Sequence, residues 1–327
     1  MPSADPTAQY AAACNAVALF DVSDRTTIEV RGKDRATFLH NFCTNDIKRL
    51  APGAGCEAFL TNIKGRILGH FVVSADEHVL WLDSDSKTGR FIASHLEKYL
   101  ITEDVTISDR SSDFAPLLLV GPGAEAWLTT HLGGLTPLPL WGQVRGTLAG
   151  ADVMIRRVAF TEPPGFEITP AASDASTVRQ AIMESGVTPA GTDVLEVLRI
   201  EAGFPRYGVD ITEDNIAQEA GRTAQAVSFT KGCYLGQEPI ARLDALGHTN
   251  RELRRLQLAA GPAPAPGTPV RSPTGDAVGV ITSAALSPVN GRPVALAMLK
   301  STALSGGTCL TVGETAATII TAGSAGP

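Results

Sequence analysis

The chain has 327 residues, of which 44% are hydrophobic and 19% are charged, as expected of a folded protein with roughly two or three domains. Its 27 Lys and Arg residues are outnumbered by 34 Asp and Glu residues, and the net charge of −7 argues against broad nucleic-acid binding. The longest apolar runs are too short to span a membrane, and the N-terminus makes a poor signal peptide. Five scattered cysteines, never in a Cys-x-x-Cys pair, favour a reducing cytoplasm and disfavour a disulfide framework or a self-contained metal site.

The N-terminal third predicts a unit of mixed helices and strands. Residues 27–31 alternate apolar and polar side chains, as a half-buried strand does. Phe38, Leu39 and Phe42 then fall on one face of a helix. Three strands are expected at residues 56–60, 66–74 and 78–82, followed by a helix over about 86–100. This order indicates an α+β fold and not a doubly wound sheet.

A second α+β unit is expected from residue 113. Its predicted elements are strands at 114–120, 153–158 and 165–169, and helices around 126–132 and 175–185. Gly121-Pro122-Gly123 is a weak nucleotide signal because the third glycine of the fingerprint is missing. A capped helix at 192–202 precedes a charged, irregular stretch at 204–220, and loops of that length are commonly functional or disordered.

The C-terminal part predicts a small all-β unit. A stiff Gly- and Pro-rich connector at 261–267 precedes short strands at 276–282, 294–299, 308–312 and 315–321. Gly313-Glu314 is typical of a two-residue hairpin turn between the last two strands. We therefore expect an N-terminal subdomain at 1–112 completed by about 190–250, a second subdomain at 113–189, and a barrel at 251–327.

The stretch at residues 229–238 places one thiol, Cys233, two residues after Lys231 and just before a predicted helix that Gly236 and Pro239 would open. A cation and a helix N-terminus both favour a thiolate, so this pattern predicts a reactive cysteine. The alternative is that Cys233 is a small buried hydrophobe, as free cysteines commonly are.

The run Lys231-Gly232-Cys233-Tyr234-Leu235-Gly236-Gln237-Glu238 resembles the signature of the YgfZ family of folate-binding proteins, a sister group of the glycine-cleavage T-protein (aminomethyltransferase). Further similarity at residues 19–23, 30–32, 44–47, 165–167 and 198–203 extends the resemblance over nearly the whole chain. The resemblance implies three subdomains around a central channel that holds tetrahydrofolate or a one-carbon derivative. It also implies that Glu167 accepts hydrogen bonds from the pterin, and that Arg199 and Tyr207 occupy folate-pocket positions.

The same resemblance implies a function. It predicts a tetrahydrofolate-binding protein that supports iron–sulphur cluster assembly or maintenance in client enzymes, including tRNA-modifying ones. Cys233 would be the reactive group, and Lys231, Tyr234, Gln237 and Glu238 would shape its surroundings. Gly69 and His70 stand where aminomethyltransferases carry an acidic pair, so we expect aminomethyl transfer to be lost. The alternatives are a folate-dependent aminomethyl or one-carbon transferase or demethylase, and an interaction module without folate.

Overall fold

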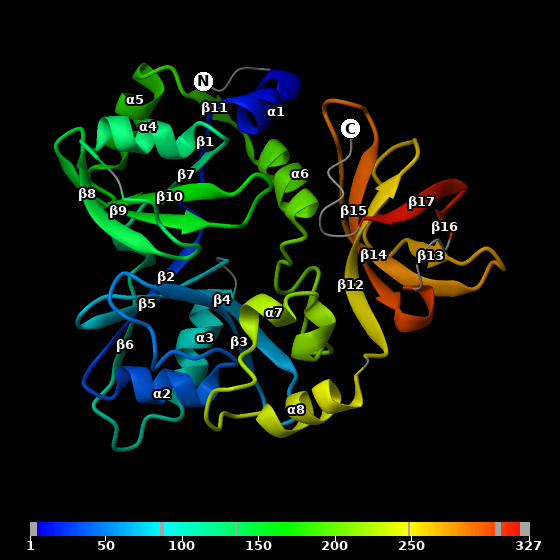
Figure 1. Cartoon of the computed structure of the whole chain (residues 1–327), viewed down its shortest axis with the longest axis horizontal. Helices are drawn as coiled ribbons and strands as arrows, with labels where there is room; N and C mark the ends of the chain where they lie inside the picture. Colours follow the sequence, from blue (N-terminus) through cyan, green and yellow to red (C-terminus); the bar gives the residue numbers. More distant parts are fainter. Residues whose placement is uncertain (1–4, 86–87, 135, 248, 305–308, 321–327) are drawn as a thin grey trace.

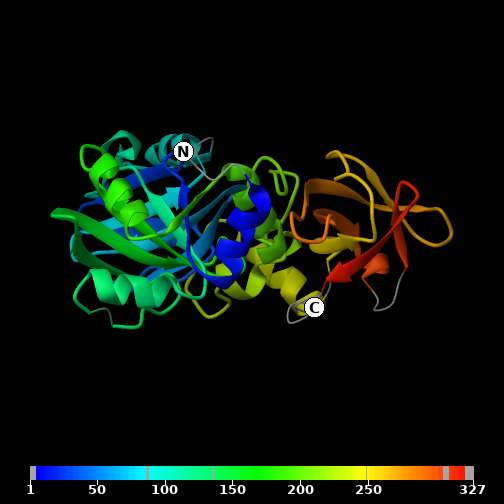
Figure 2. The same cartoon turned by 90° about the horizontal axis from the view of Figure 1, so that it is seen from above.

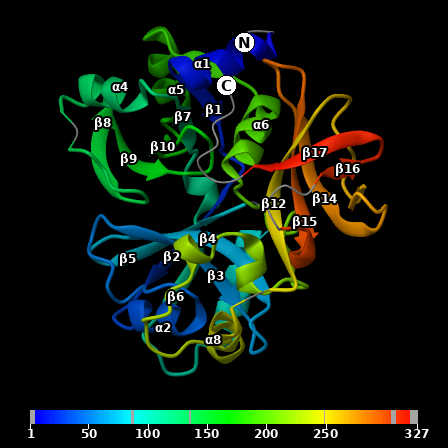
Figure 3. The same cartoon turned by 45° about the vertical axis from the view of Figure 1, so that its right-hand side comes forward.

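The computed structural model describes residues 5–85, 88–134, 136–247, 249–304 and 309–320. Two sheets lie one above the other, and a separate barrel stands beside them (Figures 1 and 3). The predicted α+β fold of three subdomains that ends in a small barrel is confirmed. Ser86, Thr308 and Thr321, where predicted elements begin or end, lie outside the described residues.

The first sheet is antiparallel and has the strand order β3-β4-β5-β2-β6. Two helices cover one of its faces with apolar side chains (Figure 1). All nine residues of β4 are buried, because the rest of the protein covers the other face. The elements are β2 (Thr26–Arg31), α2 (Arg35–Phe42), β3 (Gly55–Thr61), β4 (Ile67–Ala75), β5 (Val79–Ser84), α3 (Thr88–Glu97) and β6 (Thr106–Asp109).

The second sheet has the order β11-β1-β7-β10-β9-β8, and β1 and β11 form a parallel pair within it. Helices α4 and α5 cover its outer face (Figure 1). Strand β1 comes from the segment expected in the first subdomain, but it pairs with β7 because its apolar run is buried between two neighbours. The elements are α1 (Pro6–Asn15), β1 (Ala18–Asp21), η1 (Ser111–Asp113), β7 (Leu117–Val120), α4 (Ala124–His131), β8 (Gln143–Leu148), β9 (Ala151–Val158), β10 (Gly165–Pro170), α5 (Ala175–Glu184) and β11 (Thr188–Ala190).

Helix α6 (Thr192–Ala202) lies between the sheets and the barrel and buries apolar side chains on two sides. Val194 and Leu198 pack in the core between the two sheets, whereas Val197 and Ile200 pack toward the barrel. The predicted side-chain cap is wrong, because Gly191 occupies the N-cap position. After α6 come η2 (Ala217–Ala220), α7 (Thr223–Ala226) and α8 (Gln237–Leu246).

The C-terminal strands form a closed barrel in the order β12-β15-β14-β13-β16-β17, and pairing of β17 with β12 closes it. Figure 2 shows the barrel at one end of the molecule. The predicted hairpin at Gly313 joins Val312 to Thr315. The elements are β12 (Arg251–Leu258), β13 (Pro269–Arg271), β14 (Ala277–Leu286), β15 (Pro293–Lys300), η3 (Ser301–Ala303), β16 (Leu310–Val312) and β17 (Thr315–Ile320).

Candidate functional site

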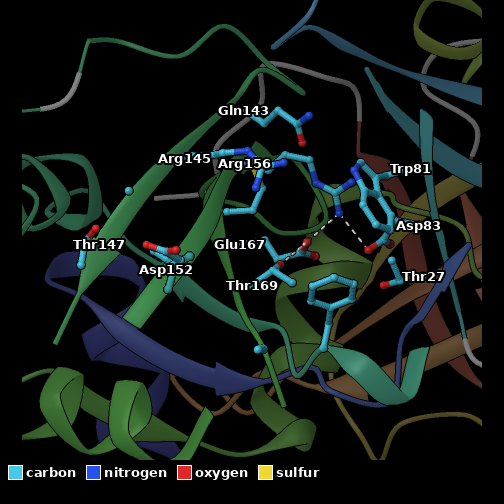
Figure 4. A pocket seen from close by; sticks show the side chains of 15 residues that line it. Thr27, Trp81, Asp83, Gln143, Arg145, Thr147, Asp152, Arg156, Glu167 and Thr169 are labelled. Atoms are coloured by element: carbon cyan, nitrogen blue, oxygen red, sulfur yellow. Dashed lines mark hydrogen bonds and ion pairs between the residues drawn. The ribbon is translucent and has the colours of Figure 1, made fainter. Parts of the chain in front are cut away.

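A first cavity of about 480 Å³ lies between the two sheets (Figure 4). Trp81 of β5 and Phe114 form an aromatic wall, with their rings edge to face and their centroids 5.6 Å apart. Gln143 of β8, Arg156 of β9 and Glu167 of β10 bring polar groups to the same hollow. An aromatic wall with a few converging polar groups is typical of a small-molecule site.

A network of two arginines and two carboxylates lies beside this cavity. Arg156 Nη2 donates to Glu167 Oε1 at 2.7 Å and to Asp83 Oδ2 at 2.8 Å (Figure 4). Arg25 Nε donates to Asp83 Oδ1 at 2.7 Å. Every charge therefore has an opposite neighbour, which buried charges require.

Burial and pairing act in opposite directions on the two carboxyls. Burial would raise the pKa of Asp83, but Arg25 and Arg156 outweigh it and hold that pKa below its ordinary value. At Glu167 burial outweighs the attraction of Arg156, and the nearby Asp83 charge adds to it, so the pKa of Glu167 is raised. The carboxylate form of Glu167 therefore stands to gain from additional hydrogen-bond donors.

Glu167 has one oxygen that the described protein atoms leave unpaired. Its Oε1 accepts from Arg156 and, at 3.3 Å, from the Thr169 hydroxyl. Its buried Oε2 accepts no hydrogen bond from the described residues, and Arg25 Nε is 4.0 Å from it. Nε of Arg156 likewise donates to no described residue. An unpaired buried polar atom costs about 1–3 kcal/mol, so a flat ligand with N–H donors and an acceptor on its edge fits this place.

A second cavity of about 540 Å³ adjoins the first, since Asp83 lines both. Arg199 of α6, Tyr207 and His70 of β4 line this second cavity. The residues predicted to bind folate therefore line two different cavities. Glu167 lines the first, and Arg199 and Tyr207 line the second.

Arg199 is held by the protein on several sides. Its guanidinium donates to Glu196 at 2.9 and 2.5 Å, to Asp210 Oδ2 at 2.7 Å and to the Phe204 carbonyl at 2.7 Å. Arg199 is therefore paired with Glu196 of its own helix. These bonds fix the start of the irregular stretch that carries Tyr207, whose hydroxyl donates to the Ile67 carbonyl at 3.3 Å.

His70 lies on a strand, as expected, but its side chain is also in a charged network beside the second cavity. Nε2 of His70 is 2.8 Å from Oε1 of Glu57 on β3. Arg222 binds both oxygens of Glu57, from Nε to Oε1 at 2.9 Å and from Nη2 to Oε2. These contacts tie the segment before α7 to the first sheet.

Cys233 is exposed and lines neither cavity. The predicted helix behind it is confirmed, since α8 starts at Gln237 with Gly236 as its N-cap. Gly236 has a φ of +87°, and a Cβ there would lie 2.3 Å from the Asn62 carbonyl oxygen, so the motif requires glycine for close packing on the β3–β4 hairpin. Within the motif Tyr234 is buried, Gln237 is half-buried, and Gly232 and Glu238 are exposed.

Lys231 has a different role from the predicted partnership with the thiol. Its ammonium donates to the carbonyl oxygens of His40 at 2.6 Å, Cys43 at 2.6 Å and Asn45 at 2.9 Å. The ammonium also lies 4.6 Å from the centre of the Tyr234 ring. Lys231 therefore fixes the motif to the end of α2 and does not hydrogen-bond Cys233 within the described structure.

Sequence reasoning missed the charged residues that form buried ion pairs beside the two cavities: Arg25, Glu57, Asp83, Arg156 and Arg222. One signal was present, because Glu57 and Arg156 interrupt strands that are otherwise mainly apolar. An unpartnered charge within a buried strand is costly, so such residues indicate a buried ion pair.

None of the described helices has the length and apolar character to cross a membrane. Among the same residues, no three His, Cys, Asp or Glu side chains are grouped so that they could hold a metal ion.

The two-sheet body with its closed terminal barrel defines a known class of protein. Residues 4–231 match the GCVT N-terminal domain, and residues 251–322 match the glycine cleavage T-protein C-terminal barrel domain. The chain therefore belongs to the glycine cleavage T-protein family.

Individual relatives agree with this assignment. An aminomethyltransferase of Chloroherpeton thalassium is 29% identical over 304 residues, which cover 90% of this chain and 82% of that protein. The crystal structure of the glycine cleavage system aminomethyltransferase T from Bartonella henselae has the same fold, with a TM-score of 0.84 at 23% identity. That match covers 96% of this chain and 88% of the other.

Proposed function

We propose that this protein binds tetrahydrofolate and takes part in folate-dependent aminomethyl or one-carbon transfer. Membership of the T-protein family and the similarity to a protein named aminomethyltransferase support this proposal. The same findings favour it over the cluster-maintenance role that the sequence suggested first. The sequence led to the opposite expectation, that aminomethyl transfer is lost because Gly69 and His70 replace an acidic pair, and turnover measurements decide between the two.

The observation that carries the proposal is the unpaired Oε2 of Glu167 in the first cavity. A pterin edge offers adjacent N–H donors that a carboxylate can accept, together with ring acceptors for a donor such as Arg156 Nε. When bound, tetrahydrofolate would supply the amine nitrogen that takes up the one-carbon unit. Glu167 would orient the ring, Arg156 would hold Glu167 in place, and Trp81 and Phe114 would cover the ring and exclude water.

The second cavity extends the proposed site. Because Asp83 lines both hollows, a ligand anchored at Glu167 has a neighbouring space in which the transferred group or the rest of the folate can lie. Arg199 and Tyr207 border that space, and we propose that they contact the ligand there. Arg199 would do so with its geometry already fixed by Glu196 and Asp210.

Calorimetric titration with tetrahydrofolate under anaerobic conditions tests the proposal. Glu167→Gln keeps the size of the side chain but replaces one of its two carboxylate oxygens by an NH2 group. Only one acceptor then remains for two donors, Arg156 and the pterin. We expect its affinity to fall about tenfold or more, since an unpaired buried donor costs about 1–3 kcal/mol.

Glu97→Gln, on the exposed side of α3, is the matched control and should bind like the wild type. Absence of binding to the wild-type protein, or equal affinity in Glu167→Gln, would refute the proposed site. Formation of a one-carbon derivative of tetrahydrofolate from aminomethyl or N-methyl donors would then separate transfer from binding alone.

A second candidate is the YgfZ-type role in maintaining iron–sulphur clusters of client or assembly proteins in the cytoplasm. The observation that favours it is the exposure of Cys233 within a motif that Lys231 and Gly236 hold rigidly. Cys233→Ala should then leave the fold and folate affinity unchanged and lower the activity of cluster-containing enzymes in cells. Normal activity of those enzymes in the variant would contradict this role.

A further inference from the structure

The side chain of His70 has an unusual position for a residue in the middle of a buried sheet. It is 5% exposed and its ring lies between those of Phe59 and Phe204, with centroid distances of 4.9 and 5.0 Å. It nevertheless lines the second cavity. The ring is therefore packed against two aromatic neighbours, and the residue that carries it borders the hollow.

Glu57 determines which ring nitrogen of His70 carries a proton. Burial alone would raise the pKa of Glu57, but hydrogen bonds from Arg222 and His70 lower it to about 2. Glu57 is thus a carboxylate at neutral pH and can only accept a hydrogen bond. Its Oε1 lies 2.8 Å from Nε2, so Nε2 must donate, and the lone pair of the neutral ring is on Nδ1.

Nδ1 of His70 makes no hydrogen bond with any described residue. A nearly buried imidazole with a free lone pair, backed by a carboxylate and an arginine, has the arrangement of a general base whose tautomer is fixed from behind. The first cavity is close by, because Asp83 on the neighbouring strand lines both hollows.

We propose that His70 accepts and returns the proton that an amine nitrogen bound in the second cavity must release during one-carbon transfer. The inference rests on the proposed function and adds a catalytic residue to it. When that nitrogen bonds to the one-carbon unit, its N–H proton passes to Nδ1. The group that leaves the carbon takes the electron pair of the broken bond and receives the proton back from Nδ1.

Glu57 stabilises the imidazolium that exists between these two steps, since the N–H at Nε2 stays on its Oε1. Arg222 keeps Glu57 charged and in position. Other charged groups also line this cavity: Asp21 of β1, Asp24 and Arg25 of the β1–β2 turn, Asp83 and Asp85 of β5 and the turn after it, and Glu196, Arg199 and Arg206 of α6 and the following loop.

A purely structural role for His70 is the competing explanation, because the ring also links Glu57 to the sheet. His70→Gln separates the two. The amide of glutamine can still donate to Glu57, so the structural link is kept, but an amide does not accept a proton. His78→Gln is the matched control, since the His78 side chain is 85% exposed in the β4–β5 turn.

The first measurement is nitrogen NMR of the histidine rings in the full chain without ligand, assigned by comparison with His70→Gln. We expect neutral His70 to carry its proton on Nε2, and Nδ1 to take up the second proton as the pH is lowered. A neutral ring protonated on Nδ1, or a ring that takes up no proton until the protein unfolds, would overturn the inference.

The second measurement is tetrahydrofolate-dependent turnover against pH. We expect His70→Gln to bind tetrahydrofolate within about twofold of the wild type but to lose about 100-fold or more in kcat, together with the acidic limb of the pH profile. His78→Gln should retain both. If His70→Gln turns over like the wild type, the proton-transfer role is wrong and the proposed function stands. If the wild type binds no tetrahydrofolate in calorimetry, the proposed function is wrong and this inference falls with it.

Discussion

Replacing Lys231 by methionine should destabilise the protein strongly, although the cysteine motif is next to the surface. The Lys231 side chain is 6% exposed, and its ammonium donates to three carbonyl oxygens at 2.6, 2.6 and 2.9 Å. Methionine fills a similar volume but donates nothing, so those carbonyls lose their charged partner.

The expected loss in the free energy of unfolding is the difference between two opposing contributions. A hydrogen bond to a charged group is worth about 1.5–3 kcal/mol, so three of them contribute roughly 4.5–9 kcal/mol. Burial of the ammonium offsets part of this, because desolvation lowers the pKa of Lys231. We therefore expect a net loss of about 3 kcal/mol in the free energy of unfolding.

Urea denaturation followed by tryptophan fluorescence measures the loss. The midpoint of the first transition in Lys231→Met should fall by about 1 M or more, given slopes of about 1–3 kcal/mol per M. Lys98→Met, at an exposed position near the end of α3, is the control and should change the midpoint little. An unchanged midpoint in Lys231→Met would refute the reasoning and restore the interpretation of Lys231 as a partner of the Cys233 thiolate.

Two further predictions concern the thiols and Glu57. Iodoacetamide at neutral pH should alkylate Cys233 and Cys309, which are both exposed, faster than the less exposed cysteines, whose pKa values burial raises: Cys14, Cys43 and Cys56. Peptide mass spectrometry that finds Cys233 the slowest to react would show that the motif is only structural. Because hydrogen bonds outweigh burial and lower the pKa of Glu57 from 4.5 to about 2, this carboxylate contributes about 3 kcal/mol above pH 4.5, and the contribution is lost as the pH falls through 2. The difference in urea stability between wild type and Glu57→Gln should thus be constant above pH 4.5 and shrink as the pH falls from 4.5 toward 2, and a difference that does not shrink there would contradict the assignment.

Local periodicity was enough to predict most of the secondary structure. Three strands of the first sheet, helix α6 and the last hairpin lie within a few residues of their predicted bounds, since alternating or helically spaced apolar residues define them. Strand β12 was missed because Arg251, Arg254 and Arg255 interrupt its apolar pattern. The barrel buries Leu253, Leu256 and Leu258 beside these half-exposed arginines, and only closure of the sheet makes that arrangement stable.

The cavities themselves were beyond sequence reasoning. Glu167 was found through resemblance, but its partners Arg156, Asp83 and Arg25 come from three other segments of the chain, and nothing in their spacing relates them. Which carboxylate an arginine meets depends on how two sheets pack, and that packing also decides whether one oxygen of Glu167 stays free for a ligand.

The cysteine motif combines, within a few residues, features that local sequence predicts and contacts that only tertiary packing determines. The start of a helix after Gly236, with Cys233 just before it, could be predicted because it depends on local backbone preferences. The contacts of Lys231 with three carbonyl oxygens near the end of α2, and of His70 with Glu57 beside a cavity, could not, because they depend on how distant segments pack. A charge pairs with the nearest opposite group in space, and packing between distant segments determines which group that is.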